Sequence, residues 1–120
     1  NEIIMIDGAH AAADAKNLAN YLKNIKIPKY GIWAMSKNKE PDLFIKQLKG
    51  VFKKVITMTI ENETNSVSAK KLYRIATKNK FKAEKSDSFT EALGKIRSSE
   101  KKLIVCFGSL YNCGNILNKN

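Results

Sequence analysis

The chain has 120 residues, of which 43% are hydrophobic and 28% charged, which is typical of one globular domain. No apolar run approaches the roughly 20 residues that a membrane-spanning helix needs, so we expect no membrane segment. The formal net charge is +11, but the positive residues are lysines scattered along the chain, with only Arg74 and Arg97 as arginines. This composition disfavours a dedicated nucleic-acid surface, because arginine is the residue best suited to bidentate phosphate and guanine recognition.

The first half of the chain alternates short apolar runs with helical patterns. Strands are expected at Ile3–Ile6, Tyr30–Met35 and Val55–Ile60, each bounded by turn residues. Between them lie two stretches with helical spacing, whose apolar residues are Ala15, Leu18, Ala19 and Leu22 in one, and Leu43, Phe44, Leu48 and Val51 in the other. Pro41 suits the first turn of the second helix.

The second half continues the alternation after the polar loop Glu61–Ser66. Ser68 and Ser88 are expected to cap two helices, and Glu91 follows Ser88 at the spacing of a capping box. The apolar residues of these helices are Leu72, Ile75 and Ala76 in the first, and Phe89, Leu93 and Ile96 in the second. A weaker strand is expected at Phe81–Glu84, another at Leu103–Phe107, and a last helix at Leu110–Leu117.

This order predicts an α/β fold, with a Rossmann-like, mostly parallel sheet of about five to six strands and helices on both faces. Residues 1–120 should form a single domain. The chain starts with Asn1 rather than Met and enters a strand almost at once, so we interpret it as a fragment of a longer chain. Cys106 and Cys113 lack metal or redox spacing and are expected to be small buried residues in a reducing, cytoplasmic setting.

Asp7 and His10 follow the first predicted strand, where ligands gather in α/β sheets. A carboxylate at this position can accept hydrogen bonds from both hydroxyls of a ribose, although Asp7-Gly8 also suits a simple tight turn. His10 could donate or accept a proton near neutral pH, or it could be a structural hydrogen-bonding residue. Both side chains are expected to face one crevice.

Two further candidates follow other strands. Ser109 comes after Gly108 at the end of the last long strand, where it can cap a helix or donate a hydrogen bond to an oxyanion. Lys39 lies in the basic loop after the second strand and is either a solvated residue or a contact for substrate or phosphate. No glycine-rich phosphate loop and no second histidine for a metal site are present, so a complete active site is not expected within this chain.

Three segments together carry a resemblance: Asp7-Gly8-Ala9-His10, the run from Ile32 to Glu40, and Gly108-Ser109-Leu110-Tyr111 with Gly114. In this order they resemble the C-terminal domain of folylpolyglutamate synthase/dihydrofolate synthase, a family of the Mur ligase superfamily. The resemblance extends over essentially the whole chain. It implies an ATP-dependent amide ligase that activates a carboxylate of dihydropteroate or a folate as an acyl phosphate, which the amine of glutamate then attacks.

The resemblance also implies roles and partners. Asp7 would bind the nucleotide ribose, His10 and Ser109 would act catalytically near the glutamate and the phosphoryl group, and Lys39 would contact substrate or phosphate. ATP and Mg²⁺ would be bound mainly by an N-terminal ATPase domain absent from this sequence. That domain would be the partner within the same chain, the enzyme would be a monomer, and this domain alone would be inactive.

Three alanines depart from the family pattern: Ala11 replaces an asparagine, Ala12 a proline and Ala34 a glycine. Asn112 and Cys113 also replace residues that are usually apolar. A degenerate, non-catalytic binding domain is therefore the main alternative. A peptidoglycan-precursor Mur ligase domain and a basic nucleic-acid-binding module are further alternatives.

Overall fold

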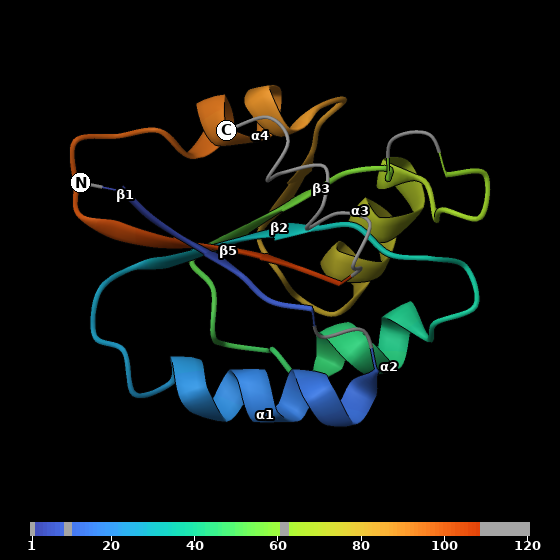
Figure 1. Cartoon of the computed structure of the whole chain (residues 1–120), viewed down its shortest axis with the longest axis horizontal. Coiled ribbons are helices and arrows are strands. Elements are labelled where there is room, and N and C mark those ends of the chain that lie inside the picture. The colour runs from blue at the N-terminus through green and yellow to red at the C-terminus, as the bar shows by residue number, and fades with distance from the viewer. Residues whose placement is uncertain (1, 9–10, 61–62, 109–120) are drawn as a thin grey trace.

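The structure, a computed structural model, describes residues 2–8, 11–60 and 63–108, in which strands and helices alternate (Figure 1). The strands are β1 (Glu2–Ile6), β2 (Lys29–Trp33), β3 (Lys54–Thr57), β4 (Ala83–Lys85) and β5 (Lys102–Phe107). The helices are α1 (Ala12–Leu22), α2 (Pro41–Lys46), α3 (Ala69–Lys78) and α4 (Phe89–Ile96). The helix expected at Leu110–Leu117 lies outside the described residues, as does Cys113.

The strands form one sheet in the order β1-β5-β2-β3-β4, and every neighbouring pair is parallel. The last described strand, β5, is inserted between β1 and β2, with Met5 and Gly31 both in register with Val105. The carboxyl ends of β1, β5 and β2 therefore lie side by side. This arrangement confirms the predicted α/β class and brings together strand ends that are far apart in the sequence.

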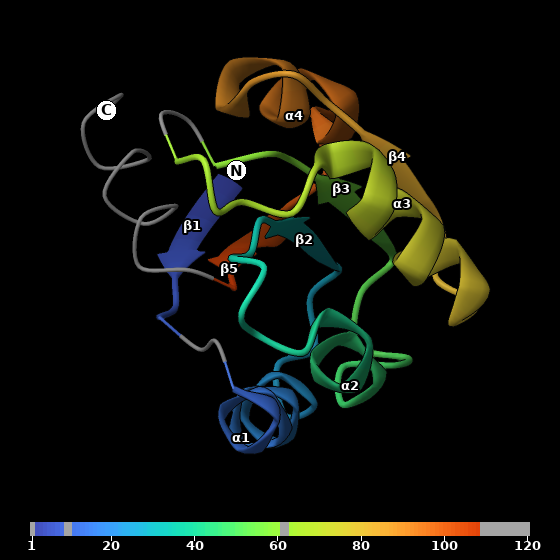
Figure 2. The ribbon, with the colours of Figure 1, turned by 90° about the vertical axis from the view of Figure 1, so that its right-hand side faces the viewer.

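Helices cover both faces of the sheet. One face packs against α1, α2 and α3 through a cluster that includes Leu18, Phe44 and Leu72. The other face packs against α4 through Phe89, Ala92 and Ile96. Figure 2 shows α1 and α2 on one side of the sheet and α4 on the other. Among the described helices none is long and apolar enough to cross a membrane.

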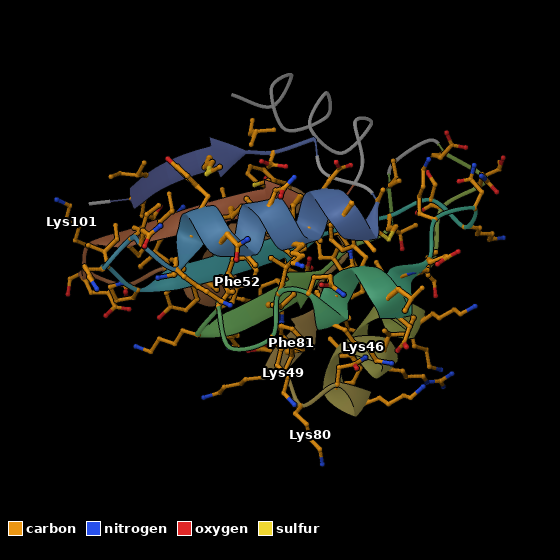
Figure 3. The ribbon with its side chains drawn as sticks, turned by 90° about the horizontal axis from the view of Figure 1, so that it is seen from below. Lys46, Lys49, Phe52, Lys80, Phe81 and Lys101 are labelled. Carbon is orange, nitrogen blue, oxygen red and sulfur yellow. The ribbon has the colours of Figure 1, made fainter. Side chains whose placement is uncertain are left out.

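The core beneath α1 and α2 is built from aromatic rings near the sheet. Trp33 stacks on Phe44 and on Phe107, with ring centroids 6.4 Å apart in both pairs. Phe107 also stacks on Phe52 at 5.3 Å. Figure 3 views the molecule from the side of α1 and α2. Phe52 lies on this side of the sheet, and lysines such as Lys49 extend outwards. The rings fix the ends of β2 and β5, which border the candidate site.

Most local predictions hold, with differences at element ends. Ser68 and Ser88 cap α3 and α4 by accepting hydrogen bonds from the backbone N–H groups of Lys71 and Glu91. Leu43, predicted to be apolar core, is 46% exposed, whereas Phe44, Leu48 and Val51 of the same predicted stripe are buried, together with Ile45.

The predicted strand boundaries also shift. The second and third strands end two or three residues earlier than expected, at Trp33 and Thr57, because the residues that follow belong to loops, in which all but Thr59 remain buried. The fourth strand is Ala83–Lys85 rather than Phe81–Glu84.

Candidate functional site

The candidate site is built at the carboxyl edge of the sheet. The Asp7 backbone N–H donates to the carbonyl oxygen of Cys106 at 2.9 Å, so Asp7 extends the pairing of β1 with β5 by one residue. The Ala34 N–H donates to the carbonyl oxygen of Phe107 at 3.4 Å. The residues that follow β1, β5 and β2 are thus held at the same edge.

Gly108 lets the chain pass close to the end of β2 where it leaves β5. Its φ of +110° is a backbone conformation that side chains disfavour, and a Cβ at this position would lie 2.1 Å from the carbonyl oxygen of Ala34. The same Cβ would lie 2.9 Å from Cδ1 of Trp33. Only glycine lets the chain leave β5 in this direction.

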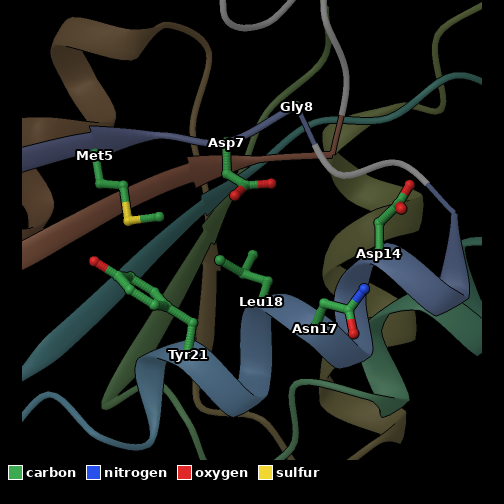
Figure 4. A pocket seen from close by; sticks show the side chains of 7 residues that line it. All are labelled: Met5, Asp7, Gly8, Asp14, Asn17, Leu18 and Tyr21. Carbon is green, nitrogen blue, oxygen red and sulfur yellow. The ribbon is translucent and has the colours of Figure 1, made fainter.

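A cleft of about 560 Å³ lies between the end of β1 and α1. Asp7 projects from the strand towards the helix, and Met5 and Tyr21 line the apolar end of the cleft (Figure 4). The described residues that line it are Met5, Asp7, Gly8, Asp14, Asn17, Leu18 and Tyr21, none of which is a lysine or arginine. Carboxylates beside an amide and an apolar wall suit the hydroxyl groups of a neutral sugar better than a phosphate.

A second cavity, of about 250 Å³, contains Lys39. It is lined by Ala11, Ala12, Asn38, Lys39 and Glu40, so the first turn of α1 and the loop after β2 meet there. Ala11 is the N-cap of α1, and its side chain cannot cap the helix. The cavity therefore combines the ammonium group of Lys39 and a helix N-terminus, which both favour an anion, with the carboxylate of Glu40.

The loop that carries Lys39 is held by the polar segment after β3. Lys37 N–H donates to the carbonyl oxygen of Asn65 at 2.7 Å, and Val67 N–H donates to that of Met35 at 2.8 Å. The buried Ser66 hydroxyl accepts a hydrogen bond from Ile60 N–H at 2.8 Å. These bonds fix residues 63–67 against the loop after β2, at the edge where the sequence predicted them.

The structure thus brings two of the four predicted site residues to the start of α1. Asp7 and Lys39 lie in separate hollows, one lined by Asp14 and the other by Ala11 and Ala12. The other two candidates, His10 and Ser109, lie outside the described residues.

The sequence analysis missed three residues that line the Asp7 cleft: Asp14, Asn17 and Tyr21. Their signal was available, because positions 14, 17, 18 and 21 share one side of a helix. No group of three His, Cys, Asp or Glu side chains in the described ranges is placed to hold a metal ion.

Comparisons with known proteins bear on the family and the fold. The sequence profile of the family described as "Dihydrofolate synthetase, C-terminal domain" matches residues 1–119. A comparison with curated proteins gives no match.

Several solved structures share the fold. Mycobacterium tuberculosis folylpolyglutamate synthase complexed with ADP and AMPPCP is 19% identical, with a TM-score of 0.86 over 97% of this chain and 29% of its own. E. coli FolC in complex with DHPP and ADP is 18% identical, with a TM-score of 0.82 over 97% of this chain and 28% of its own.

A third structure is the bifunctional folylpolyglutamate synthase/dihydrofolate synthase of Yersinia pestis, complexed with AMPPNP and a Mn ion. It is 18% identical, with a TM-score of 0.80 over 97% of this chain and 28% of its own. The chain therefore spans less than a third of each of these proteins.

Proposed function

Because the chain belongs to the family of dihydrofolate synthetase C-terminal domains, we propose that it is the C-terminal domain of an ATP-dependent ligase that adds glutamate to dihydropteroate or a folate. The observation that carries the proposal is that the Asp7 cleft and the Lys39 cavity are both lined by the first turn of α1, through Asp14 and Ala12 respectively. One hollow suits a sugar and the other an anion, and a nucleotide-dependent ligase has to hold both kinds of group.

In the proposed reaction, a carboxylate oxygen of the pteroate or folate substrate attacks the terminal phosphorus of ATP. An acyl phosphate forms and ADP leaves. The amine of glutamate then attacks the acyl carbon, the amide forms, and phosphate leaves with the bonding electron pair while the amine loses a proton. Phosphoryl transfer depends mainly on positioning and charge stabilisation, which two domains can share across a closing cleft.

Asp7 is assigned to the ribose of ATP. Among the described residues, the cleft that its side chain enters also contains the carboxylate of Asp14, which would repel a triphosphate, so the triphosphate would lie outside this cleft. Lys39 and the N-terminus of α1 are assigned to an anionic group, either the carboxylates of glutamate or the transferred phosphoryl group. His10 and Ser109 stay proposed catalytic residues on the strength of the sequence motifs alone.

The partner of this domain would be an ATPase domain of the same protein. That domain would supply the phosphate loop and bind Mg²⁺, which shields the charge of the phosphates. Closure of the two domains would also exclude water, which would otherwise hydrolyse the acyl phosphate.

A second candidate function is ligand binding without turnover. Ala11 and Ala12 are part of the Lys39 cavity and contribute only methyl groups to it. If glutamate needs a polar side chain at this position, the domain would bind nucleotide but support no ligation.

The Asp7→Asn variant of the ligase tests the first proposal. Loss of a hydrogen bond to a charged group costs roughly 1.5–3 kcal/mol, so the KM for ATP should rise by about 10-fold or more. Asp87→Asn is the matched control, because Asp87 is exposed after β4, at the far side of the sheet. An unchanged KM in Asp7→Asn contradicts the ribose assignment. Absence of glutamate-dependent ATP hydrolysis in the unsubstituted protein favours the non-catalytic alternative.

A further inference from the structure

A second charged hollow lies at the amino edge of the sheet, opposite the candidate site. Its volume is about 340 Å³, and five cations line it: Lys53, Lys54, Lys82, Lys95 and Arg97. Among the described residues of the lining, Glu100 alone carries a carboxylate. Lys53 and Lys54 lie at the start of β3, Lys82 directly precedes β4, and Lys95 and Arg97 lie at the end of α4. The fold therefore gathers charges that are dispersed in the sequence.

The positive charge of the protein is not spread evenly over its hollows. Among the described residues, the cleft beside Asp7 contains two carboxylates and no lysine or arginine, and the hollow beside β4 contains Lys85 and Lys95 against Glu84, Asp87 and Glu91. The hollow at the amino edge instead contains five cations against one acid.

The ion pairs around this hollow leave a positive excess. Lys54 and Lys95 both pair with Glu84, which lies outside the lining. Lys53 lies 3.6 Å from a carboxylate oxygen of Glu100. The described residues offer no carboxylate partner to Lys82 or Arg97. These two exposed cations are therefore available to an anion.

The end of α4 would by itself repel an anion at this place, because helix carbonyl groups carry partial negative charge. Lys102 removes that obstacle. Its ammonium group is completely buried and donates to the carbonyl oxygen of Ile96 at 2.9 Å. It also donates to the carbonyl and hydroxyl oxygens of Ser98, at 3.3 and 2.6 Å. Its three protons are thereby used, and a carboxylate oxygen of Glu2 lies 3.7 Å from it, so Lys102 neither contacts a ligand nor adds an unpaired charge to the hollow.

We propose that this hollow binds a small anion with two or more adjacent negative charges, as in a diphosphate, and that Lys82 and Arg97 contact it directly. A hollow lined by several lysines concentrates positive potential at one point. Nucleic acid fits this site less well, because the aromatic residue of the lining, Tyr30, is only 8% exposed and offers no surface for base stacking. The site is separate from the nucleotide and glutamate positions of the proposed ligase.

The test is a titration of the protein with inorganic diphosphate at 150 mM salt, followed by calorimetry and by amide NMR shifts. The double variant Lys82→Ala/Arg97→Ala is compared with Lys49→Ala/Lys70→Ala. Both variants remove two exposed cations, but Lys49 and Lys70 lie outside this hollow.

We expect saturable binding, with shifts at residues 53–54 and 97–100, that weakens by about 10-fold or more in the first variant only. Equal weakening in both variants would show attraction by net charge alone and would overturn the proposal. Shifts confined to the surroundings of Lys39 would also overturn it, since they would assign the anion to the other edge of the sheet. Absence of binding would do the same.

Discussion

The Gly108→Ala substitution should damage both the stability of the fold and the carboxyl edge of the sheet. The added Cβ would lie 2.1 Å from the carbonyl oxygen of Ala34, and the backbone would keep a φ of +110° that alanine disfavours. Backbone strain of this kind costs about 1–3 kcal/mol. Steric overpacking in a closed core costs a further 1–3 kcal/mol, roughly, so the free energy of unfolding should fall by about 2–6 kcal/mol.

Urea unfolding measures this loss, and the protein contains its own probe. Trp33 is the only tryptophan, is completely buried, and lies against the Gly108 turn, so its fluorescence should report the transition. Gly50→Ala is the matched control, because Gly50 also has a positive φ, +81°, but no atom lies within 4 Å of the added Cβ. The control carries the strain without the clash. If Gly108→Ala is no more destabilising than Gly50→Ala, the close contact of Gly108 with the end of β2 does not require glycine, and our reasoning is wrong.

Three further substitutions test the fold and its charges. Gly94→Ala, inside α4 with open space around the new Cβ, should raise the free energy of unfolding by up to about 1 kcal/mol. A decrease in this free energy, measured by urea unfolding, would contradict the helix assignment. Ala11→Asn should cap α1, whose N-cap has extended dihedral angles but no side-chain bond, and should raise the thermal midpoint through a gain of about 1 kcal/mol; an unchanged midpoint would count against that N-cap. The hydrogen bond from Lys54 lowers the pKa of Glu84, so its contribution is complete above the unfolded value of 4.5 and is lost as the pH falls through the folded value. Unfolding free energies measured from pH 6 to pH 3 should therefore decline less steeply in Glu84→Gln, and equal slopes would refute this assignment.

Sequence periodicity was sufficient for the order of elements because each element buries a regular stripe. Ala15, Leu18, Ala19 and Leu22 repeat at helical spacing and are all buried. Periodicity failed at Leu43, which lies inside α2 but is 46% exposed, whereas Leu48 and Val51, beyond the end of α2, are buried as expected. Which residues of a short helix are buried depends on tertiary packing, which the pattern does not contain.

The candidate site was only partly predictable for a similar reason. Asp7 and Lys39 follow strands, so the rule that ligands gather at strand ends identified them. That the first turn of α1 would line hollows containing both residues depends on the insertion of β5 between β1 and β2. Sheet order is a long-range property, and no local spacing predicts it. The hollow near Lys82 and Arg97 escaped prediction in the same way, because its cations come from separate segments.

The most direct test of the proposed function is the rate of glutamate-dependent ATP hydrolysis by the ligase carrying Lys39→Ala. Lys37→Ala is the control, because this exposed lysine lies in the same loop but outside the Lys39 cavity. We expect kcat/KM for glutamate to fall by about 10-fold or more in Lys39→Ala, as is typical when a charge that stabilises a reacting group is removed, and to stay near the unsubstituted value in Lys37→Ala. Equal activity of the two variants would contradict the assignment of the Lys39 cavity to the reacting groups.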